Sequence, residues 1–262
     1  MIRDVTAIWS FRHFWMSLVR LDLRNRYRRS VLGIGWSLLH PLAMTVVFCA
    51  VFSKVLNQAD WRSYAPFLLA GMAVWDFVRN SLVIGCHAFL QNESYIRQCP
   101  LPYSIYPLRV VIGIGIHFLI SLFVVVAMAG VLARGWEVLP SLVMILPGVV
   151  CVAVFSWGIA TVGAFVTVFF HDIKHLIEVA AQVFFFLTPI MYSRSLLDDK
   201  GLGFLADLNP VNLYLELIRT PLLTGQPPGW GLLAGGAALA VIALALAAGA
   251  GAWLQKKVIF HL

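Results

Sequence analysis

The stretch LVMILPGVVCVAVFSWGIATVGAFVTVF, residues 142–169, carries no charged side chain. A helix of about 20 apolar residues is long enough to cross a hydrocarbon core about 30 Å thick. Charge is also nearly absent from five other stretches of comparable length, at residues 36–56, 64–90, 108–132, 177–192 and 231–254. These six segments predict an all-α integral membrane protein with six transmembrane helices.

Composition supports a membrane protein rather than a soluble one. The 262 residues are 61% hydrophobic and 12% charged, whereas soluble domains carry about 25% charged residues. We therefore expect one membrane domain over residues 1–262, with a cytosolic and interfacial segment at 1–35, a helical membrane region at 36–254 and a cytosolic tail at 255–262. The four cysteines lack CxxC spacing and are expected to be reduced packing residues.

The segment before the first span predicts an amphipathic helix. One side of this helix carries Phe11, Phe14, Trp15, Leu18 and Leu21, and the other carries His13, Ser17, Arg20 and Arg24. Such a helix is expected to lie flat on the membrane, with its aromatic side in the acyl boundary and its arginines at anionic head groups.

The distribution of basic residues predicts the topology. With an even number of spans, the segments on the side of the N-terminus carry twelve Lys and Arg residues, and the opposite loops carry five. Cytosolic loops of membrane proteins are enriched in Lys and Arg, so we expect both termini in the cytosol. The net charge of +7 then reflects topology, and no nucleic-acid partner is expected. The long external segment 193–230 is expected to form short helices between the fifth and sixth spans.

No sequence motif of a catalytic site is present. The chain contains no GxxxxGK[ST] phosphate loop, no HExxH, no GxSxG and no dinucleotide-binding fingerprint. His171 and His175 have the spacing of a metal pair, but their charged neighbours at a membrane exit are more typical of a polar helix end. We expect neither ATP hydrolysis by this chain itself nor a metal site.

Two charged residues interrupt the second span. Asp76 and Arg79 are three residues apart on one helix face, close enough to pair. Charges at this depth are costly and usually face a protein interior or an aqueous path. The pair is either purely structural or part of a polar translocation path, in which Trp75 would stack on a sugar ring.

Two cytosolic features could bind partners. The first is a series of five arginines: Arg20, Arg24, Arg26, Arg28 and Arg29. These arginines either set the topology and anchor the chain to lipid, or bind a lipid pyrophosphate through their guanidinium groups, or do both. The second is segment 91–107, whose three prolines predict a short surface helix followed by a rigid turn. This segment is either an inert connector or an element that a partner protein grips.

Four motifs in order resemble the permease subunits of ABC-2 type polysaccharide exporters, which handle O-antigens, teichoic acids and some capsules. The similarity runs through nearly the whole chain. The motifs are RNRYRRSVLGIGWSLLHPL at residues 24–42, NESYIRQCPLPYSIYPL at 92–108, FFHDIKH at 169–175 and the Asn209-Pro210 segment. They resemble, respectively, the family's basic approach to its first span, its two cytosolic loops and its last external loop.

The resemblance implies partners and site residues. It implies two copies of this chain with two copies of a cytosolic ABC ATPase that holds ATP and Mg, no cofactor in this chain, and a polyprenyl-pyrophosphate-linked glycan crossing a bacterial cytoplasmic (inner) membrane. Substrate access would involve the five arginines above, and a channel would involve Trp36, Tyr64, Trp75, Asp76 and Arg79. ATPase coupling would involve Glu93, Ser94, Tyr95, Ile96, Arg97 and Asp172, and an external gate Asn209, Pro210 and Tyr214.

Other functions fit the sequence less well. An ABC-2 exporter of a drug or small lipid would share the fold, so only the basic N-terminal signature and the loop motifs favour a polymer. An integral-membrane enzyme acting on lipid-linked intermediates needs clustered acids or histidines, and the external acids lack a partner histidine. A secondary transporter is disfavoured because the sequence has no inverted repeat.

Overall fold

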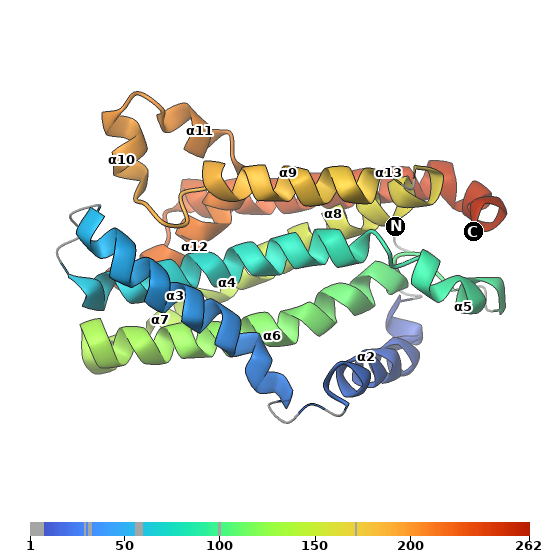
Figure 1. Cartoon of the computed structure of the whole chain (residues 1–262). Coiled ribbons are helices and arrows are strands. Elements are labelled where there is room, and N and C mark those ends of the chain that lie inside the picture. Colours follow the sequence, from blue (N-terminus) through green and yellow to red (C-terminus); the bar gives the residue numbers. More distant parts are fainter. Residues whose placement is uncertain (1–7, 29, 31–32, 56–59, 99–100, 171) are drawn as a thin grey trace.

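The computed structural model describes residues 8–28, 30, 33–55, 60–98, 101–170 and 172–262 (Figure 1). Every regular element within those ranges is a helix, so the all-α prediction is confirmed for them. The longer helices are α2 (Arg12–Tyr27), α3 (Trp36–Val55), α4 (Trp61–Gly85), α6 (Ile105–Ala129), α8 (Leu146–Phe169), α9 (Ile173–Leu187), α12 (Pro210–Thr224) and α13 (Trp230–His261). The short elements are η1 (Gly33–Gly35), η2 (Leu90–Asn92), α5 (Glu93–Gln98), the π-helical turn η3 (Gly130–Arg134), η4 (Gly135–Val138), α7 (Ser141–Met144), α10 (Arg194–Asp199) and α11 (Gly203–Asp207).

Four helical segments of the described chain are long and apolar enough to cross a membrane. They are Trp61–Gly85, Ile105–Leu132, Ser141–Phe169 and Trp230–His261. Helix α3 contains a shorter apolar segment, Leu38–Val51, and α9 has 15 residues, which span only about 22 Å at 1.5 Å per residue. By helix length and composition, the structure thus supports four of the six predicted spans. It does not confirm the count of six.

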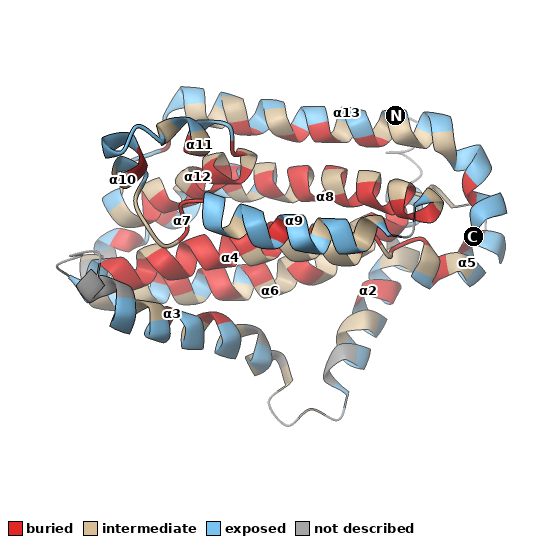
Figure 2. Cartoon of the chain, turned by 45° about the horizontal axis from the view of Figure 1, so that its top comes forward, coloured by how far each residue is buried: buried red, intermediate tan, exposed pale blue. Residues whose placement is uncertain are grey.

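Helix α4 forms the centre of the molecule. It packs against α3, α6, α8, α9 and α12, and Figure 2 shows it buried along most of its length. Asp60 begins the helix by accepting a hydrogen bond from the backbone N–H of Arg62 at 3.0 Å, which satisfies a donor that a helix start leaves free. The charged residues of the second predicted span therefore lie on the most enclosed helix.

The most extensive contact joins α8 to α13. The two helices approach so closely that a Cβ added at Gly158 would lie 2.6 Å from the carbonyl carbon of Ala243. Small residues allow such close packing of membrane helices, where van der Waals contact largely replaces the hydrophobic effect.

Helix α12 inserts among the longer helices from the external segment. It contacts α4, α8 and α13, and most of its residues are buried. Asn209 caps its start by accepting from the N–H of Val211 at 2.9 Å, Pro210 fits the first turn, where no N–H is needed, and Gly225 ends it with a positive φ of 73°. The predicted helices between the last two spans are present as α10, α11 and α12.

The bundle has two distinct ends (Figure 1). Helices α2 and α5 and the C-terminal turns of α13 gather at one end, and α7, α10 and α11 lie at the other. Helix α13 continues through Lys256 and Lys257 to His261, so the segment predicted as a cytosolic tail is helical as far as His261.

Candidate functional site

A cavity with several polar side chains lies beside α4, between this helix and α3, α6 and α9. It consists of two adjoining hollows of about 210 Å³ and 620 Å³, and both are lined by His40 of α3 and Asp76 of α4. The smaller hollow also carries Trp36, Asn80, His117 and Ser121. The larger one also carries Trp75, Arg79, Glu178, Gln182, Phe185 and Phe186. Polar groups from four helices thus converge within otherwise apolar segments.

The structure brings together four of the five residues predicted to line a channel. Trp36, Trp75, Asp76 and Arg79 all border the double cavity. Tyr64 lies apart, near the N-terminal end of α4, where its hydroxyl donates to the carbonyl oxygen of Met191 at 2.6 Å. It borders a different cavity of about 230 Å³.

The two tryptophans present different surfaces to the cavity. Trp36 is 55% exposed, so its ring is accessible. Trp75 is 5% exposed and packs against the ring of Phe185 at a centroid distance of 5.8 Å. Only Trp36 therefore offers a free face for stacking on a ligand.

The predicted pairing of Asp76 with Arg79 is wrong as a direct ion pair. Both side chains belong to the described part of the chain, and no N–O distance within 4.0 Å joins them. The guanidinium NH1 of Arg79 instead lies 3.4 Å from Oδ1 of Asn80. A separation of three residues brings two side chains to one helix face, and both residues line the larger hollow, but a shared face does not by itself bring their charged atoms into contact.

The arginine series begins on α2. Arg20, Arg24 and Arg28 are exposed, and their spacing of four residues places them along one stripe. Arg29 and the side chain of Arg26 lie outside the described residues. Helix α2 packs against α6 through a side that includes the buried Leu18 and Val19, which leaves the stripe accessible. Leu21, predicted on the apolar side, is 45% exposed.

The predicted coupling segment forms the short helix α5, as expected from its sequence. Ile96 is 7% exposed and belongs to a cluster with Phe89, Phe165 and Val258, which fastens α5 to the ends of α8 and α13. Ser94, Tyr95 and Arg97 are exposed, and Glu93 pairs with Arg97 at 2.8 Å. Asp172, in the loop predicted to be the second cytosolic one, is exposed at the start of α9. One face of α5 is thus anchored while the other remains free for contact.

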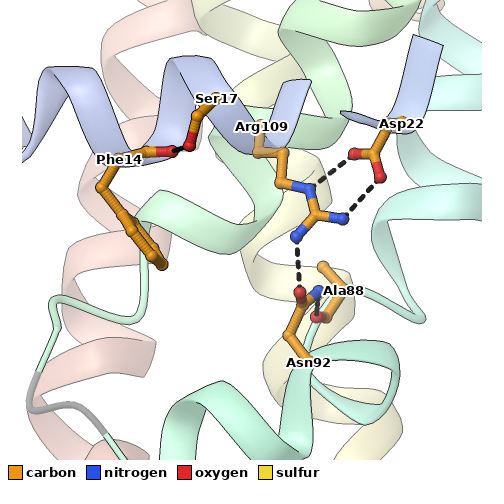
Figure 3. A network of polar contacts seen from close by, with 6 residues as sticks. All are labelled: Phe14, Ser17, Asp22, Ala88, Asn92 and Arg109. Atoms are coloured by element: carbon orange, nitrogen blue, oxygen red, sulfur yellow. Dashed lines mark hydrogen bonds and ion pairs between the residues drawn. The ribbon is translucent and has the colours of Figure 1, made fainter. Parts of the chain in front are cut away.

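An unpredicted polar junction connects α5 with α2. Arg109 of α6 donates to both carboxylate oxygens of Asp22, from Nε at 2.5 Å and from NH2 at 2.6 Å. Its NH1 donates to Oδ1 of Asn92 at 2.6 Å, and Nδ2 of Asn92 donates to the carbonyl oxygen of Ala88 at 2.7 Å (Figure 3). Asp22 and Arg109 are 87 residues apart, so no local sequence pattern indicates this contact.

The predicted external gate residues all lie on α12 or at its start. Asn209 is 4% exposed and donates from Nδ2 to Oγ1 of Thr188 at 2.7 Å, and Pro210 opens the helix. Tyr214 is fully buried, with its hydroxyl donating to the carbonyl oxygen of Gly236 at 3.0 Å. These residues fix α12 between the end of α9 and α13.

Two arginines that the sequence analysis counted among external loop charges instead hold α12 in place. Arg219 is 2% exposed and donates to the carbonyl oxygens of Phe67, Pro189 and Ile190 at 3.2, 2.6 and 2.7 Å. Arg134 donates to the carbonyl oxygens of Pro221 and Leu222 at 3.1 and 3.2 Å. The one sequence signal for this role was the placement of Arg219 within the apolar pattern of α12.

Comparison with known proteins agrees with this arrangement. The family model described as ABC-2 type transporter matches residues 13–223. The chain is 28% identical over 183 residues to a Klebsiella pneumoniae protein named O-antigen export system permease protein RfbA, covering 68% of each chain. It is 27% identical over 215 residues to a Myxococcus xanthus protein of the same name, covering 80% of each chain.

Proposed function

Because this chain belongs to the ABC-2 type transporter family, we propose that it is the permease subunit of an ABC exporter that moves a lipid-linked polysaccharide across a bacterial cytoplasmic membrane. Relatives named as O-antigen export permeases support this substrate class. Teichoic-acid and capsule polymers are further hydroxyl-rich candidates of the same class.

The observation that carries the proposal is the double cavity beside α4. The larger hollow has a mainly apolar lining, as ligand sites generally do, and it also carries His40, Asp76, Arg79, Glu178 and Gln182. These polar groups can exchange hydrogen bonds with sugar hydroxyls, which supports a polymer substrate. Trp36 adds an accessible ring on which a sugar can stack.

Two copies of the chain would complete the path. Helices α3 and α9 border the larger hollow, and each exposes apolar side chains. Those of α9 are Leu176, Val179, Val183, Phe184, Phe186 and Leu187. We propose that α3 and α9 provide the first and fifth of six spans, with both termini in the cytosol, and that a second copy closes the path from the side of these helices.

The arginine stripe of α2 would receive the substrate lipid. Helix α2 is proposed to lie at the cytosolic membrane surface, where Arg20, Arg24 and Arg28 meet head groups and the pyrophosphate of a polyprenyl-linked glycan. The proposed role extends to Arg26 and Arg29, which the sequence resemblance also assigns to substrate access. Guanidinium groups bind phosphate oxygens through paired hydrogen bonds, which suits a ligand with two adjacent phosphates.

A separate ATPase would drive transport, with ATP and Mg bound on that subunit. We propose that two ATPase copies contact Glu93, Ser94, Tyr95 and Arg97 of α5 together with Asp172, while the buried Ile96 anchors the helix.

At the other end of the bundle, Asn209, Pro210 and Tyr214 hold α12 as an external gate. Tyr64 lies at the same end and fits this gate better than the central cavity.

The experiment is copurification with a cognate ATPase followed by ATP hydrolysis assays in liposomes. Three probes are compared: a polyprenyl-pyrophosphate-linked glycan, polyprenyl pyrophosphate alone and a small amphiphile. Stimulation that requires the glycan supports the proposal. A stable complex that responds only to the small amphiphile would replace the polysaccharide with a drug or lipid substrate, and failure of any ATPase to bind would refute the transport function.

A further inference from the structure

Three elements meet at the guanidinium of Arg109 (Figure 3). Asp22 belongs to α2, Arg109 to the first turns of α6, and Asn92 is the residue directly before α5. A single side chain therefore connects the helix that carries the arginine stripe with the start of the helix that faces the cytosol.

The geometry of this junction makes it rigid. The two bonds from Arg109 to Asp22, at 2.5 and 2.6 Å, fix the relative orientation of guanidinium and carboxylate. The Arg109 side chain is 13% exposed, so water competes little for its donors. Asn92 is 3% exposed, and its amide is locked by its bond to Ala88. The Asp22 side chain is 42% exposed, so the ion pair alone contributes little. The bidentate geometry and the fixed third partner Asn92 are what restrain the relative positions of the three elements.

A second contact joins α2 with α5 at another point. The rings of Phe14 and Tyr95 meet edge to face at a centroid distance of 6.1 Å. Phe14 lies eight residues before Asp22, about 12 Å along the helix at 1.5 Å per residue. Two attachments at this separation hinder α2 from pivoting about either one, in addition to the packing of α2 on α6, and they favour joint movement of α2 and α5.

We propose that Arg109 is a positioning residue that makes α2 and α5 move as one body, so that the ATP-driven displacement of α5 repositions the arginine stripe at the membrane surface. This inference rests on the proposed function, because it takes α5 as the ATPase contact. By this route, ATP binding on the ATPase subunit changes the position of the arginines that bind the lipid pyrophosphate on the permease subunit.

The test measures distances between pairs of spin labels in the reconstituted complex of the permease with the ATPase. One label of each pair reports the position of α2 or of the segment at α5. The native cysteines are replaced by alanine, and labelled chains are diluted with unlabelled copies. One double-cysteine variant carries labels at Leu21 of α2 and Val131, and the other at Gln91 of η2 and Val131. All three positions are exposed, and Val131 at the opposite end is the reference. ATP is expected to shift both distance distributions.

The junction is then altered by Asp22→Asn and, separately, by Arg109→Lys, which keeps the charge but lacks the fork. In both variants we expect the Gln91 shift to persist, while the ATP-shifted population of the Leu21 pair falls about fivefold or more, the low end of typical coupling between sites. Asp207→Asn, which breaks the exposed pair with Arg194 at 2.5 Å, is the matched control and should change neither distribution.

Two results would overturn the inference: an undiminished Leu21 shift in both junction variants, or loss of both shifts together in correctly assembled complexes. If ATP moves neither pair in the unaltered chain, both this inference and the proposed ATPase contact are refuted. The label shifts require no glycan. An error in the substrate class would therefore leave them intact and would appear only in the stimulation assay.

Discussion

The side chain of Arg219 meets Phe67 in two ways: its guanidinium carbon lies 3.7 Å from the centroid of the Phe67 ring, and its Nε donates to the Phe67 carbonyl oxygen at 3.2 Å. The guanidinium also donates hydrogen bonds to the carbonyl oxygens of Pro189 and Ile190. A buried cation thus joins α4, the end of α9 and α12 without an acidic partner at hydrogen-bond distance among the described residues. Gly71 faces the guanidinium where a Cβ would collide with it.

Replacing this cation should destabilise the contacts that α12 makes with α4 and with the end of α9. In Arg219→Met, buried carbonyl acceptors lose their donors, at a cost of about 1 to 3 kcal/mol for each acceptor left unpaired. The measurement is thermal unfolding of the purified permease in detergent, and we expect a clearly lower midpoint. Lys200→Met, at an exposed position, is the control and should change stability by less than about 0.5 kcal/mol. Equal midpoints for both variants would contradict the role assigned to Arg219.

The close approach of α8 and α13 gives a second stability prediction. In Gly158→Ala, the new methyl group would lie 2.6 Å from the Ala243 carbonyl carbon, so the helices must separate. Overpacking of this kind costs about 1 to 3 kcal/mol. Gly249→Ala on α13 is the matched control, because its Cβ would meet no atom within 4 Å. Unfolding of the two variants under identical detergent conditions distinguishes them, and a Gly158→Ala protein as stable as the control would show that the contact is looser.

Much of the helical arrangement follows from sequence. Backbone polar groups in lipid must be satisfied within the segment, so long charge-poor stretches become helices, and α3, α4, α6, α8, α9 and α13 begin and end near their predicted limits. The position of helix α12 does not follow from sequence, because its apolar positions fit a helix at the membrane boundary as well as one inside the bundle. The sequence pattern does not distinguish burial by lipid from burial by protein.

Most of the polar contacts cannot be predicted from the sequence. Arg109 pairs with Asp22 across 87 residues, and Arg219 and Arg134 bind backbone carbonyl oxygens, which have no residue signature. Asp76 and Arg79 have the right spacing for a pair but do not form one. Spacing along a helix identifies a shared face, whereas the partner of a long side chain depends on the tertiary environment.

The accessible ring of Trp36 provides a test of the central cavity. In Trp36→Ala, loss of stacking worth about 0.5 to 1.5 kcal/mol should reduce glycan export about two- to tenfold while complex assembly is unchanged. Export is measured as surface glycan, and assembly as ATPase recovered with the tagged permease. Trp230→Ala, at a position that is 87% exposed and outside the cavity, should retain export. A parallel loss of export and assembly in Trp36→Ala would indicate a structural role instead.

The arginine stripe can be tested by exchanging guanidinium for ammonium groups. A chain with Arg20, Arg24 and Arg28 all replaced by lysine keeps every charge for topology and lipid attraction, but loses the paired donors that suit phosphate. We expect weaker binding of polyprenyl pyrophosphate in nanodiscs, with unchanged insertion and unchanged attraction to anionic lipids. Unaltered pyrophosphate binding would leave topology and lipid anchoring as the sole roles of the stripe.

The most direct measurement is translocation itself. Proteoliposomes containing the permease and its ATPase are supplied with a labelled polyprenyl-pyrophosphate-linked glycan on the ATPase side, and the glycan reaching the opposite side is quantified with and without ATP. We predict ATP-dependent transfer of the glycan, and none with a hydrolysis-deficient ATPase. ATP hydrolysis accompanied by transfer of a small amphiphile, with the glycan remaining on its original side, would contradict the assignment.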